Sequence, residues 1–294
     1  MNASRPVLGI INAQRQTEGS GFVVRRPFPT GGVDNVDQFL LLDEMGPVDY
    51  APGKAIGAPD HPHRGFETVT YILSGEMEHR DSNGGHGVIT PGAVQWMTAG
   101  SGIVHSEMPS NQLMRKGGRM HGFQLWVNLP AAKKMILPRY QGFEAHEIPS
   151  ATTPDGAVVR VISGEVAGVR GTVDTTSPVT YAHVALPAGA AIEWEVADGH
   201  TALVHTFVGS AVVNGTEAVE GVMVVCDRTA GSVNVQAGDE GAEVLLLGGQ
   251  PLGEPVARYG PFVMNTREEI IQAFDDYEAG RLGTIVASGS GISR

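Results

Sequence analysis

The sequence has little cysteine and little charge. Its one cysteine, Cys226, cannot form a disulfide within the chain, and it reads as a small buried apolar residue. Charged residues make up 18% of the 294 positions, against roughly 25% in an average soluble protein. Because 41% of the residues are apolar and are spread along the chain, the low charge does not indicate disorder.

Long apolar runs and clusters of basic residues are also missing. No apolar stretch approaches the ~18 residues that a membrane-spanning helix requires, and the apolar run near the N-terminus is too short for a secretory signal. A formal net charge of −12 disfavours binding to nucleic-acid phosphates. We therefore expect no membrane span, no direct contact with nucleic acid and a cytoplasmic location, or a nuclear one in a eukaryotic source.

Glycine and proline are abundant and indicate many turns. The sequence holds 40 glycines and 18 prolines, which separate short β-type runs at intervals of roughly 8–12 residues. This spacing predicts an all-β fold of barrels or sandwiches. Residues 130–156 contain four prolines and interrupt the pattern, so we predict two β units, residues 1–139 and 140–294.

One helix is expected near the C-terminus, in the stretch NTREEIIQAFDDYEAGRLG. Thr266 and Glu269 have the spacing of a capping box, which satisfies two backbone N–H groups at the start of a helix. The apolar residues of this stretch fall on one helical stripe: Ile270, Ile271, Phe274 and Tyr277. A stripe of this kind has to be buried, and we expect the helix to pack across the two β units.

Two pairs of polar residues with identical spacing indicate a metal site. His61 and His63 lie two residues apart, as do His105 and Glu107, and residues i and i+2 of a strand point to the same face. If the two strands are neighbours with these faces inward, three imidazoles and a carboxylate converge. That set suits an octahedral first-row metal with open positions better than structural zinc. Each pair alone is a weak signal, because most such pairs are ordinary strand residues with polar tips in solvent.

The block PDHPHRGFETVTYILSGEMEHRDSNGGHGVITPGAVQWMTAGSGIVHSEMP resembles the signature of the pirin family, within the cupin superfamily. The stretches FLLLDEMGP, GFQLWVNLP and YGPFVMNTREEI agree with it. The resemblance implies a bicupin: two jelly-roll β-barrels with a metal in the N-terminal barrel alone. The ligands that it implies are His61, His63, His105 and Glu107.

Ferrous iron (Fe2+) is the metal that the resemblance implies, with Mn, Ni, Cu and Zn as alternatives that the ligand types also suit. In the second unit, His200 and His205 are five residues apart and fall on opposite faces of a strand, so we expect that barrel to hold no metal.

Other residues near the motifs have two interpretations each. Glu67 occupies the position at which general cupins place a ligand, but we expect it to orient a ligand histidine by a hydrogen bond. The histidines outside the pairs are expected at the surface or in the core: His79, His86 and His121. Several large apolar side chains could line a pocket or fill the barrel core: Phe66, Trp96, Met97, Phe123 and Trp126.

The resemblance implies a dioxygenase that opens the central ring of a flavonol such as quercetin, with insertion of oxygen and release of carbon monoxide. The partners would be a small aromatic chelating substrate and O2, and Glu107 would act as the general base. The alternative is an iron-containing redox sensor that binds a protein partner, either a transcription factor or a metabolic enzyme, and changes its activity.

Overall fold

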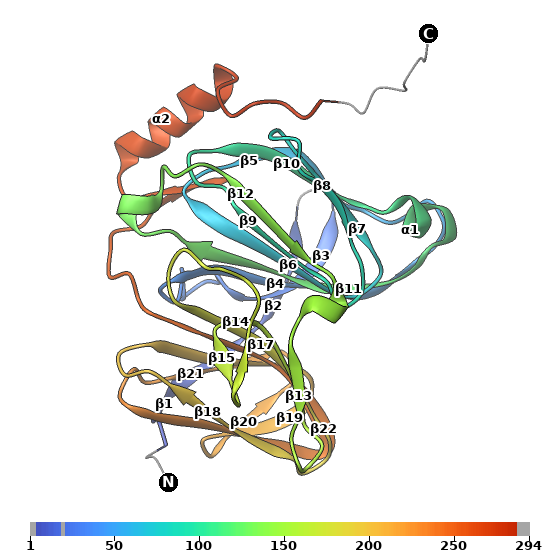
Figure 1. Cartoon of the computed structure of the whole chain (residues 1–294), viewed down its shortest axis with the longest axis vertical. Coiled ribbons are helices and arrows are strands. Elements are labelled where there is room, and N and C mark those ends of the chain that lie inside the picture. The colour runs from blue at the N-terminus through green and yellow to red at the C-terminus, as the bar shows by residue number, and fades with distance from the viewer. Residues whose placement is uncertain (1–3, 19–20, 287–294) are drawn as a thin grey trace.

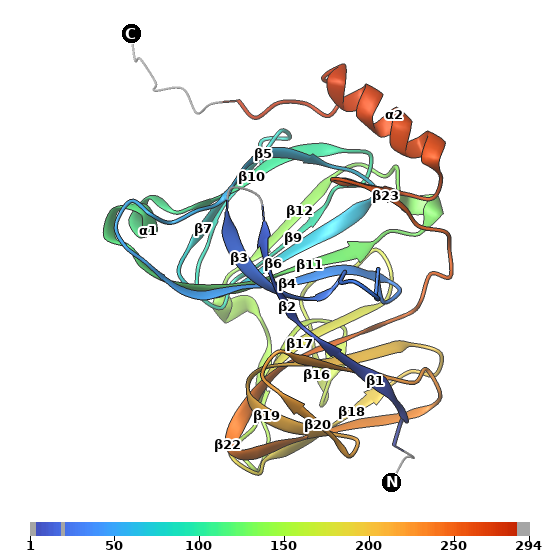
Figure 2. The same cartoon turned by 180° about the vertical axis from the view of Figure 1, so that it is seen from behind.

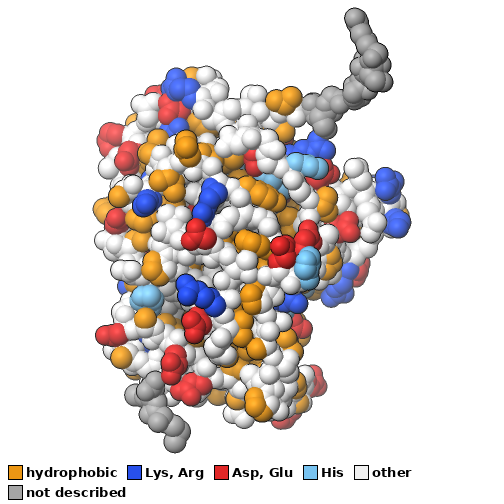
Figure 3. All heavy atoms as spheres, in the orientation of Figure 1, with side chains coloured by type: hydrophobic (Ala, Val, Ile, Leu, Met, Phe, Trp, Pro, Cys, Tyr) orange, Lys and Arg blue, Asp and Glu red, His pale blue; other side chains and the backbone are white. Residues whose placement is uncertain are grey.

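The computed structural model describes residues 4–18 and 21–286 (Figure 1). Its regular structure is almost entirely β, arranged as two barrels stacked along the long axis, which confirms the predicted fold class. In the part of the chain that is described, no helix is long and apolar enough to cross a membrane. On the face drawn in Figure 3, acidic, basic and apolar side chains are interspersed.

The first barrel consists of two antiparallel sheets. Among the described residues, the larger sheet has the order β12-β9-β6-β11-β4-β3-β2 and the smaller has the order β5-β10-β7-β8. The strands of the larger sheet are β2 (Gln14–Glu18), β3 (Phe22–Phe28), β4 (Phe39–Tyr50), β6 (Phe66–Ser74), β9 (Val94–Thr98), β11 (Gly118–Asn128) and β12 (Arg139–Phe143). The strands of the smaller sheet are β5 (Ala58–His63), β7 (Met77–Asp81), β8 (His86–Ile89) and β10 (Ile103–Pro109).

The second barrel is formed by one sheet that curls on itself. Its longest strands, β19 and β22, pair over most of their length, and shifts in register along β19 let the same strands take part in both layers. The strands are β1 (Val7–Asn12), β13 (Ser150–Thr152), β14 (Val158–Ser163), β17 (Val179–Leu186), β18 (Ala191–Val196), β19 (Thr201–Val213), β20 (Thr216–Val219), β21 (Val222–Cys226) and β22 (Gly231–Gly249).

Short elements connect and extend the barrels. They are α1 (Asn111–Lys116), η1 (Ala131–Lys133), η2 (Ala145–Glu147), the hairpin of β15 (Glu165–Val166) and β16 (Val169–Arg170), the hairpin of β23 (Ala257–Tyr259) and β24 (Phe262–Met264), and α2 (Arg267–Glu278). We call residues 257–286, which contain β23, β24 and α2, the tail.

Alternation along the strands assigns neighbouring buried side chains to different cores. In β6, Ile72 packs inside the first barrel with Met45, Met77 and Met120, whereas Tyr71 faces the second barrel. The interface between the barrels is therefore an apolar layer between two sheets, and it contains side chains from both barrels. The interior of the second barrel is a separate apolar core.

The ends of the chain cross between the barrels, so the predicted division into residues 1–139 and 140–294 does not match the sheets. Strand β1, from the first range, pairs with β21 in the second barrel (Figure 2). Strand β12, which begins at Arg139 and runs into the second range, pairs with β9 in the first barrel. The tail follows the second barrel in sequence but packs on the first.

Helix α2 forms where the sequence predicts it, with the expected capping box. The Thr266 hydroxyl accepts from the Glu269 N–H, and the Glu269 carboxylate accepts from the Thr266 N–H. The predicted position across both barrels is wrong, because α2 lies on the first barrel with Ile270 packed beside Val104 (Figure 1). Ile271, expected in the buried stripe, is 51% exposed.

Candidate metal centre

Three histidines from two neighbouring strands meet inside the first barrel. His105 of β10 is the register partner of His61 of β5, and His63 lies two residues further along β5. Ligand atoms of these three side chains all lie within 4.8 Å of one another. The ring centroids are 4.3 Å apart for His61 and His105 and 4.9 Å for His63 and His105. The three imidazoles that the sequence predicts to converge therefore do lie together.

Backbone carbonyls fix the orientation of two of these rings. Nδ1 of His61 lies 2.7 Å from the carbonyl oxygen of Pro59, and Nδ1 of His63 lies 3.2 Å from that of Pro261 in the tail. A carbonyl can only accept a hydrogen bond, so Nδ1 of each ring carries the proton and donates it. Nε2 of each ring then keeps a lone pair, which is the form in which histidine binds a metal.

His105 supplies the test of whether a metal fits. Its side chain is fully buried, and neither ring nitrogen has a hydrogen-bond partner within the described residues. Burial and the neighbouring histidines lower the pKa of both His63 and His105 well below its usual value, so both rings are neutral at pH 7. Buried polar groups are rarely left without a partner. Three converging imidazoles, one of which has no hydrogen-bond partner, suit a first-row transition metal.

Glu107 lies beside this group rather than within it. Between His105 and Glu107 the pairing with β5 shifts, so that Glu107 pairs with Ala58 instead of continuing the regular register. Its Oε1 accepts a short hydrogen bond from the Thr70 hydroxyl on β6, across the barrel interior. The Thr70 oxygen in turn accepts from Nε2 of Gln124 at 3.3 Å. This chain holds one carboxylate oxygen of Glu107 at a fixed position.

A cleft of about 560 Å³ opens onto His61 and His63. This volume lies within the range of small-molecule sites, roughly 300–1,000 Å³. The cleft is lined by residues of the first barrel and the tail, among them His61, His63, Glu107, Gln124, Trp126 and Arg258. Glu107 and Gln124 also border an apolar void of about 30 Å³ deeper in the barrel, where Met45, Met77 and Met120 line the wall.

Glu67 does not orient a histidine, contrary to the expectation. It faces the second barrel, like Tyr71 on the same strand, and its Oε1 accepts from the hydroxyls of Thr98 at 2.7 Å and Thr176 at 2.9 Å. Burial raises the pKa of this carboxyl. The sequence could not show this, because the period of a strand says which residues share a face but not which layer covers that face.

The remaining histidines of the first barrel lie at the surface or in the core, as expected. His79 is buried beside His105, with ring centroids 5.4 Å apart, and its nitrogens contact Asp81 and Gln95. His86 is exposed and lies 3.1 Å from Glu78. His121 is buried at the interface between the barrels.

The large apolar side chains divide between core and cleft. Trp96 and Phe123 belong to the interface core, and Met97 packs against Ile103 in a small core of its own. Trp126 lines the cleft, with Phe66 packed 4.3 Å from its ring. The second barrel is filled by apolar side chains around Trp194.

Four contributors to the site were missed in the sequence: Thr70, Gln124, Arg258 and the Pro261 carbonyl. Thr70 lies only seven residues after His63 but on the next strand, whereas the other three lie far from both pairs in sequence. Arg258 and Pro261 follow the whole second barrel in sequence, and of the two only Pro261 lies in a stretch that carries the resemblance, YGPFVMNTREEI.

Both halves of the chain match one protein family. Residues 21–127 match the family Pirin, and residues 181–283 match the Pirin C-terminal cupin domain. A pirin-like protein from Caulobacter vibrioides is 47% identical over 281 residues, which span 94% of this chain and 99% of that protein. Pirin from Homo sapiens is 40% identical over 288 residues, or 96% of each chain.

A solved structure shows the same likeness in three dimensions. The crystal structure of a quercetin 2,3-dioxygenase from Acinetobacter baumannii is 39% identical and superposes with a TM-score of 0.91. The superposition covers 97% of this chain and 100% of that one. The similarity therefore extends over both barrels and the tail.

Proposed function

The chain belongs to the pirin family, and from that premise we propose that it is a metal-dependent dioxygenase that opens the ring of a flavonol-like substrate with O2. The observation that carries the proposal is the fully buried imidazole of His105, which has no hydrogen-bond partner and lies beside His61 and His63. His61 and His63 line a cleft large enough for such a substrate. The likeness to a quercetin 2,3-dioxygenase supports the choice of substrate class.

The proposed ligands of the metal are His61, His63, His105 and Glu107. Ferrous iron at this position would supply a centre at which a chelating substrate and O2 can exchange electrons. Manganese, nickel, copper and zinc suit the same donors, and the identity of the metal stays a prediction. The cytoplasmic location and a protein partner also stay predictions.

The protein's own groups would prepare the substrate. A flavonol binds through its 3-hydroxyl and the adjacent carbonyl, and loss of the hydroxyl proton makes the ring electron-rich. Glu107 lines the cleft, so its carboxylate can take that proton as a general base. Thr70 occupies Oε1 of Glu107, which leaves Oε2 for the metal or for the proton. Trp126 offers a flat apolar wall against which an aromatic ring can stack.

The test is turnover by protein reconstituted with Fe2+ without oxygen and then mixed with quercetin in air. We expect oxygen uptake together with loss of the flavonol absorbance. His61→Ala should abolish both, whereas His86→Ala removes an exposed histidine of the same barrel and should leave both unchanged. A wild-type protein that binds iron but consumes no oxygen would contradict the proposal, and oxidation-dependent binding of a protein partner would then favour a sensor.

A further inference from the structure

The cleft has a wall that the second half of the chain supplies. Arg258, on β23 of the tail, lines the same cleft as His61, His63 and Glu107. The tail reaches this position because Phe262 bridges to Arg64 of the first barrel and the Val263 N–H donates to the Arg64 carbonyl. A residue far from the histidine motifs is thereby placed where a bound substrate would lie.

The Arg258 side chain forms one end of a row of ring contacts that leads to His63, a proposed ligand. Its guanidinium carbon lies 4.8 Å from the centre of the Trp126 ring, and that ring lies 5.1 Å from the ring of His63. Nη1 of Arg258 donates to the carbonyl oxygen of Leu40 at 3.2 Å, which fixes the orientation of the planar group. An aromatic ligand that extends along Trp126 from the histidines would reach Arg258 with its outer end.

Arg258 differs in its charge environment from Arg26, the other arginine of this cleft. Arg26 is neutralised, since it forms a two-point hydrogen bond with Asp43 and a 2.8 Å ion pair with Glu18. Across residues 4–18 and 21–286, no carboxylate forms an ion pair with Arg258. Asp43 and Glu18 of the same cleft act on its charge only from a longer distance, and its side chain keeps an exposed face. The guanidinium is therefore a fixed and accessible cation with donors still to satisfy.

We propose that Arg258 is a specificity-determining residue and that it recognises an anionic oxygen of the substrate. The substrate class is then a planar aromatic chelator that carries a carboxylate at the end remote from its chelating oxygens. Planar guanidinium groups suit carboxylates because they donate two parallel hydrogen bonds. This inference rests on the proposed function in one respect: a metal at the histidines has to bind the chelating oxygens of the substrate.

The test compares two probes that differ in one group, 3-hydroxyflavone and 3-hydroxyflavone with a carboxylate at the 4′ position. Binding is measured by the absorbance of the chelate, with Zn2+ or Ni2+ in the site and without turnover. Wild-type protein should prefer the carboxylated probe by about tenfold, which corresponds to ~1.4 kcal/mol. Arg258→Met keeps an apolar stack on Trp126 and should lower that ratio to about one, whereas Arg258→Lys should retain part of the preference.

A matched control separates recognition from net charge. Arg228→Met removes one positive charge from an exposed position of the second barrel and should leave the preference intact. Equal affinity of the wild-type protein for the two probes, or an undiminished ratio in Arg258→Met, would overturn the inference. The assay measures binding without turnover, so the preference for the carboxylated probe can be determined even if the protein does not open the ring. Binding of neither probe would reject this inference and the proposed chelation together.

Discussion

At the scale of single residues, the position of the Glu107 carboxylate depends on a hydroxyl from the opposite sheet. Thr70 is the direct partner of Glu107, and Gln124 fixes the Thr70 oxygen. A carboxylate that both binds a metal and takes a proton needs one orientation, and groups behind a ligand commonly change metal affinity by 10- to 100-fold. We therefore propose that Thr70 is a positioning residue, which acts through Glu107 rather than on the substrate.

Replacing Thr70 tests this role. Thr70→Val keeps the shape but removes the hydroxyl, so we expect metal affinity to fall by about tenfold and the pH profile of turnover to shift. Thr70→Ser retains the hydroxyl and should restore both. The measurements are titration of the apoprotein with Co2+, followed by its visible spectrum, and kcat/KM against pH. A serine variant that behaves like the valine variant would show that packing, and not the hydrogen bond, is responsible.

The sequence allowed the three histidines to be predicted as a group, because a strand's period of two residues settles which side chains share a face. The same reasoning could not find Thr70 or Gln124. They approach Glu107 from strands of the facing sheet, and which residues face each other across a barrel depends on the stacking of sheets rather than on spacing within a strand.

At the scale of elements, the tail is part of the candidate metal site. Lys134 joins it to the barrel, because its buried ammonium donates to the carbonyl oxygens of Gly65 at 2.7 Å and Val263 at 3.0 Å. Burial lowers the pKa of Lys134 to about 8. The Pro261 carbonyl that orients His63 lies in the turn between β23 and β24. A displacement of this hairpin would therefore change the orientation of His63, a proposed ligand.

Gly65→Ala should displace the hairpin. Gly65 has a φ of +85°, and a Cβ there would lie 1.9 Å from the carbonyl oxygen of Val263. We expect the hairpin to move, the His63 contact with Pro261 to break, and metal affinity to fall by about tenfold. Isothermal titration with Zn2+ measures this change. Gly253→Ala is the matched control, since its φ of +64° imposes similar strain on a residue whose Cβ would meet nothing within 4 Å.

Equal metal affinity in the two alanine variants would show that the hairpin does not support the site. Each variant should also lose about 1–2 kcal/mol of stability from the left-handed backbone alone. A fall in stability without a fall in affinity is therefore not evidence for the role.

Helix α2 shows what an amphipathic pattern can and cannot predict. Thr266 and Glu269 fix its start through local hydrogen bonds, so the sequence suffices for its position in the chain. Its apolar stripe requires burial but does not name the surface that provides it. The surface is the first barrel, which the chain reaches again only through the hairpin of β23 and β24.

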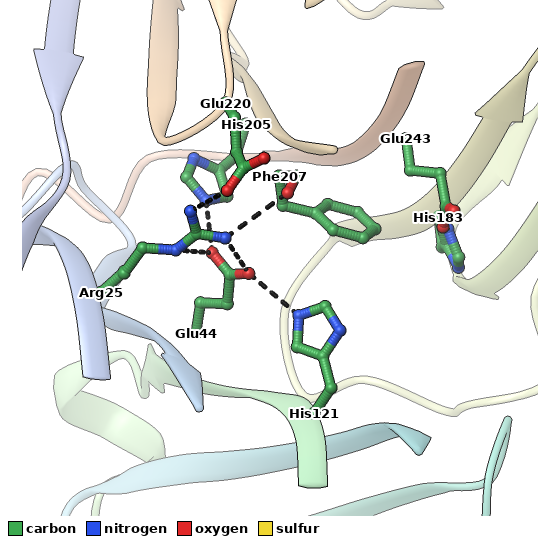
Figure 4. Close-up of polar contacts among 8 residues, drawn as sticks. All are labelled: Arg25, Glu44, His121, His183, His205, Phe207, Glu220 and Glu243. Atoms are coloured by element: carbon green, nitrogen blue, oxygen red, sulfur yellow. Dashed lines mark hydrogen bonds and ion pairs between the residues drawn. The ribbon is translucent and has the colours of Figure 1, made fainter. Parts of the chain in front are cut away.

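At the scale of the whole molecule, a buried carboxylate lies where the two barrels meet (Figure 4). Glu44 of the first barrel accepts a hydrogen bond from Arg25. Its Oε1 also lies 2.9 Å from Nε2 of His121, which donates a second hydrogen bond. His205 of the second barrel lies 3.9 Å away, and Arg25 also bonds Glu220 of that barrel. These contacts link the barrels beside the apolar interface.

The ionised form of Glu44 stabilises the fold. Burial alone would raise its pKa, but the contacts with His121, His205 and Arg25 lower it from 4.5 to about 2. A carboxyl whose pKa is lower in the folded state stabilises the fold above its unfolded pKa, and the contribution is lost as the pH falls through the folded pKa. The difference of about 2.5 pKa units corresponds to roughly 3 kcal/mol, lost between pH 4.5 and 2.

Glu44→Gln should therefore lower the free energy of unfolding by about 3 kcal/mol at pH 6, and the deficit relative to wild type should shrink as the pH falls below 4.5. Urea unfolding at pH 6, 4 and 3 measures both effects. Glu217→Gln, at an exposed position of the second barrel, should change neither. If the deficit stayed constant with pH, the charge of Glu44 would not be the stabilising group.

The crossing of the chain ends sets the order in which this molecule can be assembled during translation. The three histidines are synthesised early, in β5 and β10. Strands β23 and β24 are synthesised only after every strand of the second barrel. A nascent chain halted between the barrels would hold its histidines without the Pro261 carbonyl behind one ring or the guanidinium at the rim. The pocket can therefore be completed only after the second barrel has been synthesised.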